Sequence, residues 1–158
     1  MSGDASESNG FVLTDSFVID TSVALKWYIP EAGRAEALCF MAPGIHRHAP
    51  NLLPLEGAHA LLKRARSTDP SVRLSIEEVL LLVETLRTSA PIVYHDCDSL
   101  LAASVALAIE IGSSTYDGLF LALAIRLDGR VVTADRKFHD KIQASPYHPR
   151  VRWFMDLP

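Results

Sequence analysis

The sequence contains few cysteines, no excess of positive charge and no long apolar run. Its two cysteines, Cys39 and Cys97, suit neither a disulfide framework nor a paired metal motif, which favours a reducing cytoplasm. The net charge of −4 excludes the strongly basic domain that binds nucleic acid by charge alone, although it allows a local basic patch. The longest apolar run, around residues 119–125, is too short to span a bilayer. With no signal-like segment at the start, we expect a cytoplasmic protein without a membrane partner.

The composition is typical of one soluble globular domain. The chain has 158 residues, of which 49% are hydrophobic and 22% are charged. It begins with MSGDASESNG, a run of small and polar residues. We therefore expect residues 1–15 to be a polar, flexible tail and residues 16–158 to form a single domain.

Short apolar segments alternate with longer helical patterns, and there is no internal repeat. The expected strands are 17–19, 45–49, 91–95, 130–135 and 151–155. The expected helices lie within 23–29, 31–41, 51–67, 76–88, 97–112, 114–129 and 136–142. Strands that alternate with helices pair in parallel, with helices on both faces of the sheet. The predicted fold is therefore α/β, a three-layer sandwich around a central parallel sheet.

Several helix boundaries carry local signals. Asn51 is the expected N-cap of the third helix, with Pro54 in its first turn. Ser75 and Glu78 have the spacing of a capping box at the next helix start. Gly112 is the expected end of the helix that begins near Cys97. The helix that follows is apolar nearly all round, so we expect it to be central in the fold.

Four acidic residues occupy similar positions relative to the predicted elements. Asp20 and Asp135 follow apolar strands, whereas Glu56 and Asp117 lie in the first turns of helices. The helix dipole alone explains a single acid near a helix start. In a parallel sheet, however, the carboxyl ends of strands and the starts of the following helices meet at one edge. We therefore expect these four carboxylates to converge.

Four uncompensated carboxylates repel one another, and a hard divalent cation removes the conflict. Oxygen ligands suit Mg²⁺ or Mn²⁺, and no set of cysteines and histidines competes for zinc. Thr21, Ser22 and Thr133 would border this edge and could orient a carboxylate or a metal-bound water. Ordinary helix capping and strand propensity explain the same three hydroxyl residues equally well.

Basic residues cluster in two places despite the acidic total. Arg136 and Lys137 follow Asp135 directly and are the better candidates for contacts with the phosphates of a nucleic acid. Lys63 to Arg66 lie at the end of a helix, where a solvated face with cations near the helix C-terminus is the preferred interpretation. The apolar positions 76, 79, 80 and 83 could serve a partner or be buried within the chain.

Three segments together resemble the PIN-domain family, and more narrowly its VapC-type toxins from type II toxin–antitoxin pairs. The segments are VIDTSVALKWY, APNLLPLEGAHAL and TYDGLFLALAIRLDGRVVTADRKF, and the resemblance covers about residues 17–140. It implies a Mg²⁺- or Mn²⁺-dependent endoribonuclease. Asp20 and Asp117 would be the principal metal ligands, Asp135 would help to hold this ion or a second one, and Glu56 would orient or deprotonate the attacking water.

The resemblance also implies partners. VapC-type proteins usually form homodimers, are inhibited by a cognate VapB-like antitoxin and cleave structured RNA, often transfer RNA. Three features depart from the family pattern: the polar extension before the first strand, a longer tail after Asp140, and Gly118 where alanine is frequent. The glycine is expected to loosen its helix start.

Two other functions remain open from the sequence. The first is a catalytically silent PIN-fold module that binds RNA or protein. The second is another Mg²⁺-dependent phosphoryl-transfer enzyme, since Asp20-Thr21-Ser22 superficially resembles the DxD start of haloacid-dehalogenase-like phosphatases. Ser22 stands where the second acid of that motif belongs, which weakens this alternative.

Overall fold

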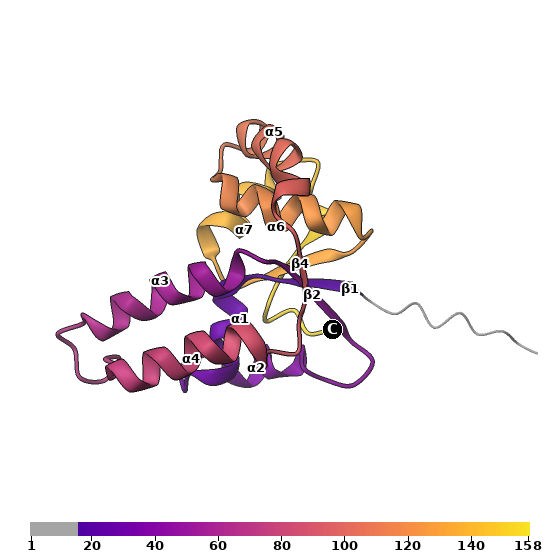
Figure 1. The fold of residues 1–158 in the computed structure, drawn as a ribbon. Coiled ribbons are helices and arrows are strands. Elements are labelled where there is room, and N and C mark those ends of the chain that lie inside the picture. The colour runs from indigo at the N-terminus through magenta and orange to yellow at the C-terminus, as the bar shows by residue number, and fades with distance from the viewer. Residues whose placement is uncertain (1–15) are drawn as a thin grey trace, which may run out of the picture.

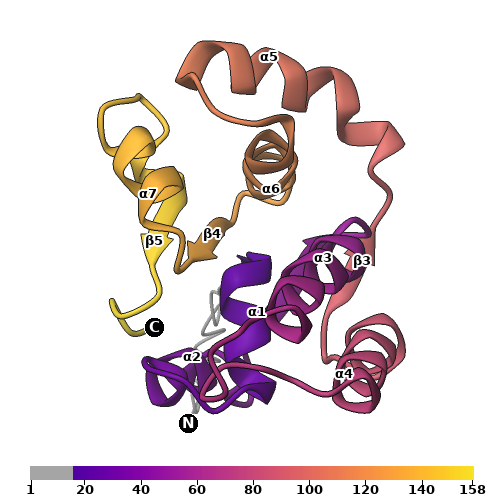
Figure 2. The same cartoon turned by 90° about the vertical axis from the view of Figure 1, so that its left-hand side faces the viewer.

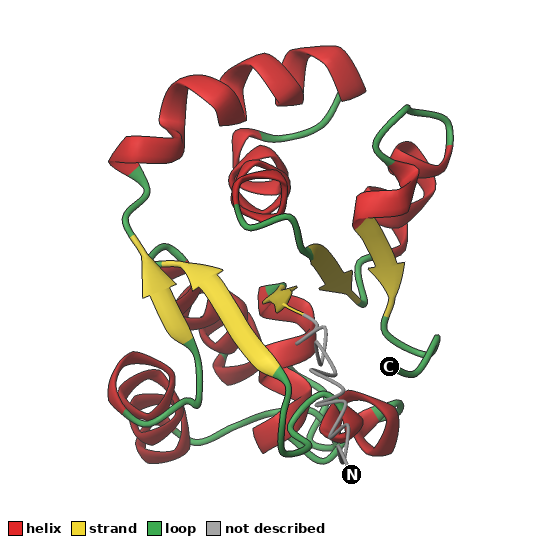
Figure 3. Ribbon diagram, turned by 90° about the vertical axis from the view of Figure 1, so that its right-hand side faces the viewer, coloured by secondary structure: helices red, strands yellow, loops and turns green. Residues whose placement is uncertain are grey.

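The computed structural model describes residues 16–158, so the predicted tail at 1–15 lies outside the described residues. Five parallel strands form one sheet in the order β3-β2-β1-β4-β5. Their bounds are β1 (Ser16–Ile19), β2 (His46–Pro50), β3 (Val93–His95), β4 (Arg130–Thr133) and β5 (Val151–Trp153). The predicted parallel α/β sheet is confirmed, and Figure 3 shows its strands in yellow among the helices.

Helices cover both faces of this sheet. Figure 1 shows α5, α6 and α7 on one side and α1 to α4 on the other, which gives the predicted three layers. The helices are α1 (Thr21–Tyr28), α2 (Arg34–Cys39), α3 (Leu53–Ala65), α4 (Ile76–Thr88), α5 (Leu101–Ile111), α6 (Thr115–Arg126) and α7 (Arg136–Gln143). Two 3-10 turns, η1 (Asp98–Leu100) and η2 (His148–Arg150), precede α5 and β5.

The core lies along the two central strands and α6. Phe17, Val18 and Ile19 in β1 are almost completely buried, as are Val131 and Val132 in β4. Such continuous apolar runs are typical of parallel strands that are covered on both faces. Residues 118–124 of α6 are also all buried, which confirms that this helix is central.

Of the three helix boundaries with local signals, two are present and one is wrong. Ser75 and Glu78 form the predicted capping box, and α5 ends at Gly112, whose φ is 64°. Asn51, however, does not cap α3, because the helix begins one residue later than an Asn51 cap requires. Its side-chain oxygen instead accepts a hydrogen bond from the backbone of Cys97 at 3.2 Å. A partner 46 residues away cannot be inferred from local capping rules.

Gly118 tightens the start of α6 rather than loosening it. A Cβ added at this position would lie 2.2 Å from the backbone oxygen of Ser104 in α5. The two helices therefore approach as closely as they do only because residue 118 has no side chain. The expected loosening is wrong, because the glycine meets a packing requirement that the sequence of α6 alone does not reveal.

The four apolar positions singled out in α4 do not share one environment. Ile76 and Leu80 are 70% and 64% exposed, whereas Val79 and Val83 pack against the core. The pairing of α4 with α3 forms an arm that extends away from the sheet in Figure 1. Burial within the chain thus explains only half of this apolar face.

Within residues 16–158, no single helix has the length and apolar character needed to cross a membrane. The segments 98–111 and 115–126 meet the length and composition criteria only when taken together, and they are bent by 112° relative to each other.

Candidate active site

The structure brings the four predicted acids to one edge of the sheet. Asp20 follows β1, Asp135 follows β4, and Glu56 and Asp117 lie in the first turns of α3 and α6. All four line one cleft of about 670 Å³, together with Thr21 and Ser22. Figure 2 looks onto this edge, with α1, α3, α6 and α7 arranged around it. The convergence follows from the parallel topology, because strand ends and helix starts share this edge.

Asp20 is held by two hydroxyl groups. Its Oδ2 accepts a hydrogen bond from Thr133 Oγ1 at 2.8 Å and another from Ser22 Oγ. Thr133 Oγ1 in turn accepts from the backbone N–H of Asp135, and Ser22 Oγ accepts from that of Ala134, each at 2.9 Å. Because each hydroxyl accepts from a backbone N–H, its own proton is free to point at the carboxylate. Ser22 and Thr133 thus fix the orientation of the Asp20 carboxylate.

Glu56 is oriented by the remaining hydroxyl of the set. Thr21 Oγ1, on the first residue of α1, donates to Glu56 Oε2 at 2.8 Å. Thr21 is buried, so this bond is shielded from water. The contact joins α1 to α3 at the cleft and sets the position of Glu56 relative to Asp20.

Asp117 and Asp135 also cap the helices on which they stand. Asp117 forms a capping box with Ser114, and its Oδ2 also accepts from Ser113 Oγ. Asp135 is the N-cap of α7, where its Oδ1 accepts from the backbone of Lys137 at 2.8 Å and that of residue 138 at 3.1 Å. The sequence predicts Asp135 only as an acid that follows a strand. The helical pattern that begins directly after it is the signal for this second role.

In each of the four carboxylates, one oxygen accepts at least one hydrogen bond. The other oxygen has no hydrogen-bond partner among residues 16–158. Burial raises the pKa of Asp20 to about 6, and the charges of Asp117 and Asp135 add to the rise while Ser22 and Thr133 oppose it. Burial likewise raises the pKa of Glu56 to about 7, against the bond from Thr21 and together with the other acids. The cleft is therefore rich in carboxylate oxygens and short of positive charge.

This donor set fits a hard divalent cation. All the candidate ligands are oxygens, which Mg²⁺ and Mn²⁺ prefer. In the part of the chain that the structure describes, no three acidic, histidine or cysteine side chains are close enough to coordinate one ion directly. The arrangement therefore suits an ion that retains much of its water shell and contacts one or two carboxylates, as is usual for Mg²⁺.

The two predicted RNA-contact residues lie beside the cleft rather than in its lining. The Arg136 guanidinium stacks 3.9 Å from the centre of the Trp153 ring, and Lys137 is exposed.

Among the lining residues that the sequence does not assign to the site, three carry polar or aromatic side chains, namely His59, Lys63 and Tyr116. The position of Lys63 near a helix end favours a solvated face, but this residue stands two helical turns beyond Glu56 on the same side of α3. That spacing is the signal in the sequence that could have placed it in the site.

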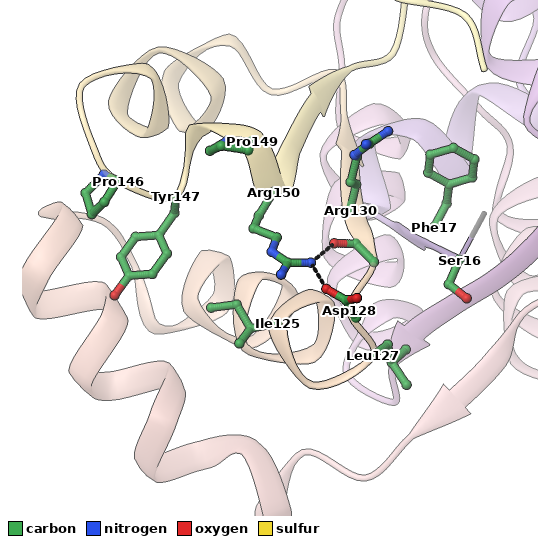
Figure 4. Close-up of a pocket in the computed structure, with 11 residues that line it drawn as sticks. Ser16, Phe17, Ile125, Leu127, Asp128, Arg130, Pro146, Tyr147, Pro149 and Arg150 are labelled. Carbon is green, nitrogen blue, oxygen red and sulfur yellow. Dashed lines mark hydrogen bonds and ion pairs between the residues drawn. The ribbon is translucent and has the colours of Figure 1, made fainter. Parts of the chain in front are cut away.

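A second hollow lies at the opposite, amino-terminal ends of the strands. It measures about 800 Å³ and is bordered by Ser16, Arg130 and Tyr147 among others. Its lining contains one carboxylate, Asp128, which forms an ion pair of 2.6 Å with Arg150 (Figure 4). A paired acid has no excess charge to offer a cation, so this hollow has none of the features of the acidic cleft despite its larger volume.

The fold and the site together define a class of protein. A family model described as the PIN domain matches residues 17–142, so the chain belongs to the PIN-domain family. The predicted family membership is confirmed.

Individual relatives agree with this assignment. The chain is 27% identical over 130 residues to Ribonuclease VapC3 from Pyrobaculum aerophilum, a match that covers 80% of this chain and 95% of that protein. Among solved structures, it resembles PAE2754 from the same organism with a TM-score of 0.57 and 20% identity, over 80% of this chain and 86% of the other. It also resembles a toxin–antitoxin complex from Klebsiella pneumoniae with a TM-score of 0.57 and 16% identity, over 87% and 96% of the two chains. At these identities, the structural matches show a common fold.

Proposed function

We propose that this protein is a metal-dependent endoribonuclease and the toxin of a toxin–antitoxin pair. The observation that carries the proposal is the cleft in which four carboxylates each have one fixed and one free oxygen. Membership of the PIN-domain family and the similarity to a VapC ribonuclease support the same reaction. Hydrolysis of a phosphodiester needs charge stabilisation and an activated water, and this cleft contains groups suited to both tasks.

Asp20 and Asp117 would hold Mg²⁺ or Mn²⁺, with Asp135 holding the same ion or a second one. When bound, such an ion polarises a phosphate and lowers the pKa of bound water. Ser22 and Thr133 keep Asp20 in position for this role. Glu56, with its pKa raised by burial to about 7, is matched to accept a proton from the attacking water near neutral pH. Thr21 holds one oxygen of Glu56 and leaves the other available.

The proposal includes partners and location. The substrate would be a structured RNA such as a transfer RNA, and the inhibitor a VapB-like antitoxin. The similarity in fold to a toxin–antitoxin complex from Klebsiella pneumoniae supports the second partner. The active form would be a cytoplasmic homodimer. Sedimentation of the purified chain with and without a candidate antitoxin would measure both associations.

The test of the reaction is cleavage of total RNA by the purified protein in Mg²⁺ or Mn²⁺, with a chelator arm. We expect cleavage that stops on chelation and returns with added metal. Asp117→Asn and Glu56→Gln should each lower the rate by roughly 100-fold or more. The matched control is Asp140→Asn, which removes an exposed acid outside the cleft lining and should leave the rate unchanged.

Two results would overturn the proposal. Cleavage that survives chelation, or that Asp117→Asn retains, would exclude this chemistry. Tight RNA or antitoxin binding without any cleavage would instead favour the silent-module alternative. The phosphatase alternative has no support in the structure, because the Ser22 hydroxyl is committed to Asp20 and to a backbone N–H.

A further inference from the structure

The cleft continues beyond the four acids along one face of α3. Glu56, His59 and Lys63 are spaced by three and four residues, and all line the cleft. Residues with this spacing lie on one face of a helix. Seven residues of helix place the backbones of Glu56 and Lys63 about 10 Å apart, which is more than the spacing of neighbouring phosphates along one nucleic-acid strand. A strand whose scissile phosphate is at the acids would therefore reach Lys63 with its next phosphates.

Lys63 lacks the ionic partner that nearby cations have. Lys26 and Arg64 both form ion pairs with Glu31. Lys63 is exposed and forms no ion pair or hydrogen bond with any residue in the range 16–158. The rest of the cleft lining contains four acids and no other lysine or arginine. An anionic substrate that enters an acidic cleft needs positive charge, and Lys63 supplies it at the end away from the acids.

Tyr116 lines the same cleft and offers an aromatic surface. It directly precedes Asp117, lines the cleft and is 56% exposed. Its hydroxyl forms no hydrogen bond within the described range, so no neighbouring polar group holds the ring away from a ligand. Leu55, which is 69% exposed, contributes an apolar wall to the same cleft. Exposed aromatic and apolar groups beside a phosphate-binding site suit a nucleobase.

We propose that Tyr116 and Lys63 form a subsite for the nucleotide next to the scissile phosphate. Tyr116 stacks on its base, and Lys63 neutralises the phosphate on the side away from the acids. The proposal rests on the proposed ribonuclease function and adds a substrate requirement, namely an unpaired nucleotide beside the cleavage point. A basic peptide is the rival occupant of this acidic cleft, but Lys63 would repel it.

The test uses a fluorescent single-stranded RNA oligonucleotide that the wild-type protein cleaves. Lys63→Met should raise KM roughly tenfold at low salt while kcat stays within about twofold, and should reduce the salt slope of kcat/KM by about one. Lys63→Arg should restore the wild-type values. The control is Arg73→Met, an exposed cation outside the cleft lining, which should leave the slope unchanged.

Tyr116 is tested on the same substrate. Tyr116→Ala should lower kcat/KM roughly tenfold, because it removes one stacking contact, whereas Tyr116→Phe keeps the ring and should match the wild type. An abasic nucleotide next to the scissile bond should make wild type and Tyr116→Ala equal. Thermal unfolding of each variant shows whether its fold is intact, which we expect because both side chains are exposed.

The outcomes separate this inference from the proposed function. If the wild-type protein cleaves RNA and Lys63→Met behaves like Arg73→Met, the subsite is wrong and the nuclease stands. If the wild-type protein cleaves no RNA under any metal condition, the proposed function fails. If Lys63→Met leaves RNA kinetics unchanged but tightens binding of an arginine-rich peptide, the cleft is a peptide-docking surface and the subsite is overturned.

Discussion

The two hollows at opposite ends of the same sheet differ in charge far more than in size. The amino-terminal hollow is the larger, at about 800 Å³ against about 670 Å³. Its single acid, Asp128, is paired with Arg150. The carboxyl-terminal cleft holds four acids, and burial together with their mutual repulsion raises the pKa of Asp20 and of Glu56. Uncompensated charge therefore distinguishes the end of this sheet that holds the candidate site, and volume does not.

This contrast has a physical basis in the parallel fold. Helix starts gather at the carboxyl ends of the strands, and their free N–H groups favour negative charge there. The amino-terminal end receives helix ends instead, where Arg150 donates to the carbonyl of Gly129 at 3.3 Å. The parallel topology therefore allows acids to accumulate at the carboxyl-terminal end of the sheet, whereas the single acid of the amino-terminal hollow is paired with Arg150.

The largest expected effect comes from removing one acid from the cleft. Asp20→Asn should lower RNA cleavage by roughly 100-fold or more, since a proposed direct metal ligand would be lost. In chelator, the same change should leave the free energy of unfolding unchanged or raise it, because it relieves repulsion at a buried carboxylate. Chemical denaturation and a cleavage assay on the same preparation measure both. A variant that is both active and less stable would contradict the contrast between the two ends.

Two tightly packed glycines, one at each end of the sheet, test whether the backbone there tolerates a shift. A Cβ on Gly118 would meet the Ser104 oxygen at 2.2 Å, and one on Gly129 would meet the Ser16 oxygen at 2.4 Å. Each alanine substitution should therefore destabilise the protein by about 1–3 kcal/mol, despite the better helix propensity of alanine at position 118. Only Gly118→Ala should reduce the cleavage rate of the folded protein, because it adjoins Asp117. Equal losses of cleavage would show that the acidic end has no special sensitivity.

The pH dependence of stability should follow from the acidic end. Because the folded pKa values of Asp20 and Glu56 are raised to about 6 and about 7, their contribution to stability is fully present below pH ~4 and is lost as pH rises through these values. In chelator, the free energy of unfolding should fall by about 4 kcal/mol from this cause between pH 5 and pH 8. Saturating Mg²⁺ should reverse the fall.

The difference between wild type and Asp20→Asn isolates this effect from other titrating groups. His48 acts in the opposite direction, since burial, together with the charges of His95 and His46, lowers its pKa. A wild-type profile parallel to that of Asp20→Asn would contradict the assignment of excess charge to the cleft.

The smallest effect is expected at the amino-terminal hollow. Asp128→Asn should change stability by less than about 1 kcal/mol, because the side chain of Asp128 is 89% exposed and such ion pairs contribute little. The φ of 50° at this position also suits asparagine. Cleavage and the pH slope should not change. A large loss of cleavage in this variant would place function at both ends of the sheet.

The fold could be predicted from the sequence because its strongest signals are local and periodic. The apolar runs of β1 and β4 and the near-uniform apolarity of α6 were sufficient to predict a buried parallel sheet with a central helix. The errors arose at residues whose role depends on contact with a residue that is distant in the sequence. The Asn51 side chain accepts a hydrogen bond from the backbone of Cys97, and Gly118 leaves room for the backbone of Ser104. Neither contact can be recognised from the neighbouring residues in the sequence.

The candidate site was predictable to a similar extent. The positions of the acids followed from topology, and the structure adds how each is held. The direction of each hydroxyl bond, such as Thr21 to Glu56 and Thr133 to Asp20, depends on the packing of α1 against α3 and β4. Tyr116 could not be assigned to the cleft, because a single aromatic residue on a helix does not show which neighbouring element it faces. For Lys63, only its seven-residue spacing from Glu56 indicated the same side of α3.

The hydrogen bonds of the acids bear on how inactive relatives could be recognised. Asp117 and Asp135 complete helix starts, so a lineage that no longer cut RNA would still lose folding stability on replacing them. Asp20 makes no capping bond with its side chain, and Glu56 bonds only to Thr21. If a homologue loses activity during evolution, Asp20 and Glu56 should consequently be replaced first. Inactive homologues should therefore be sought by substitutions at these two positions before the others.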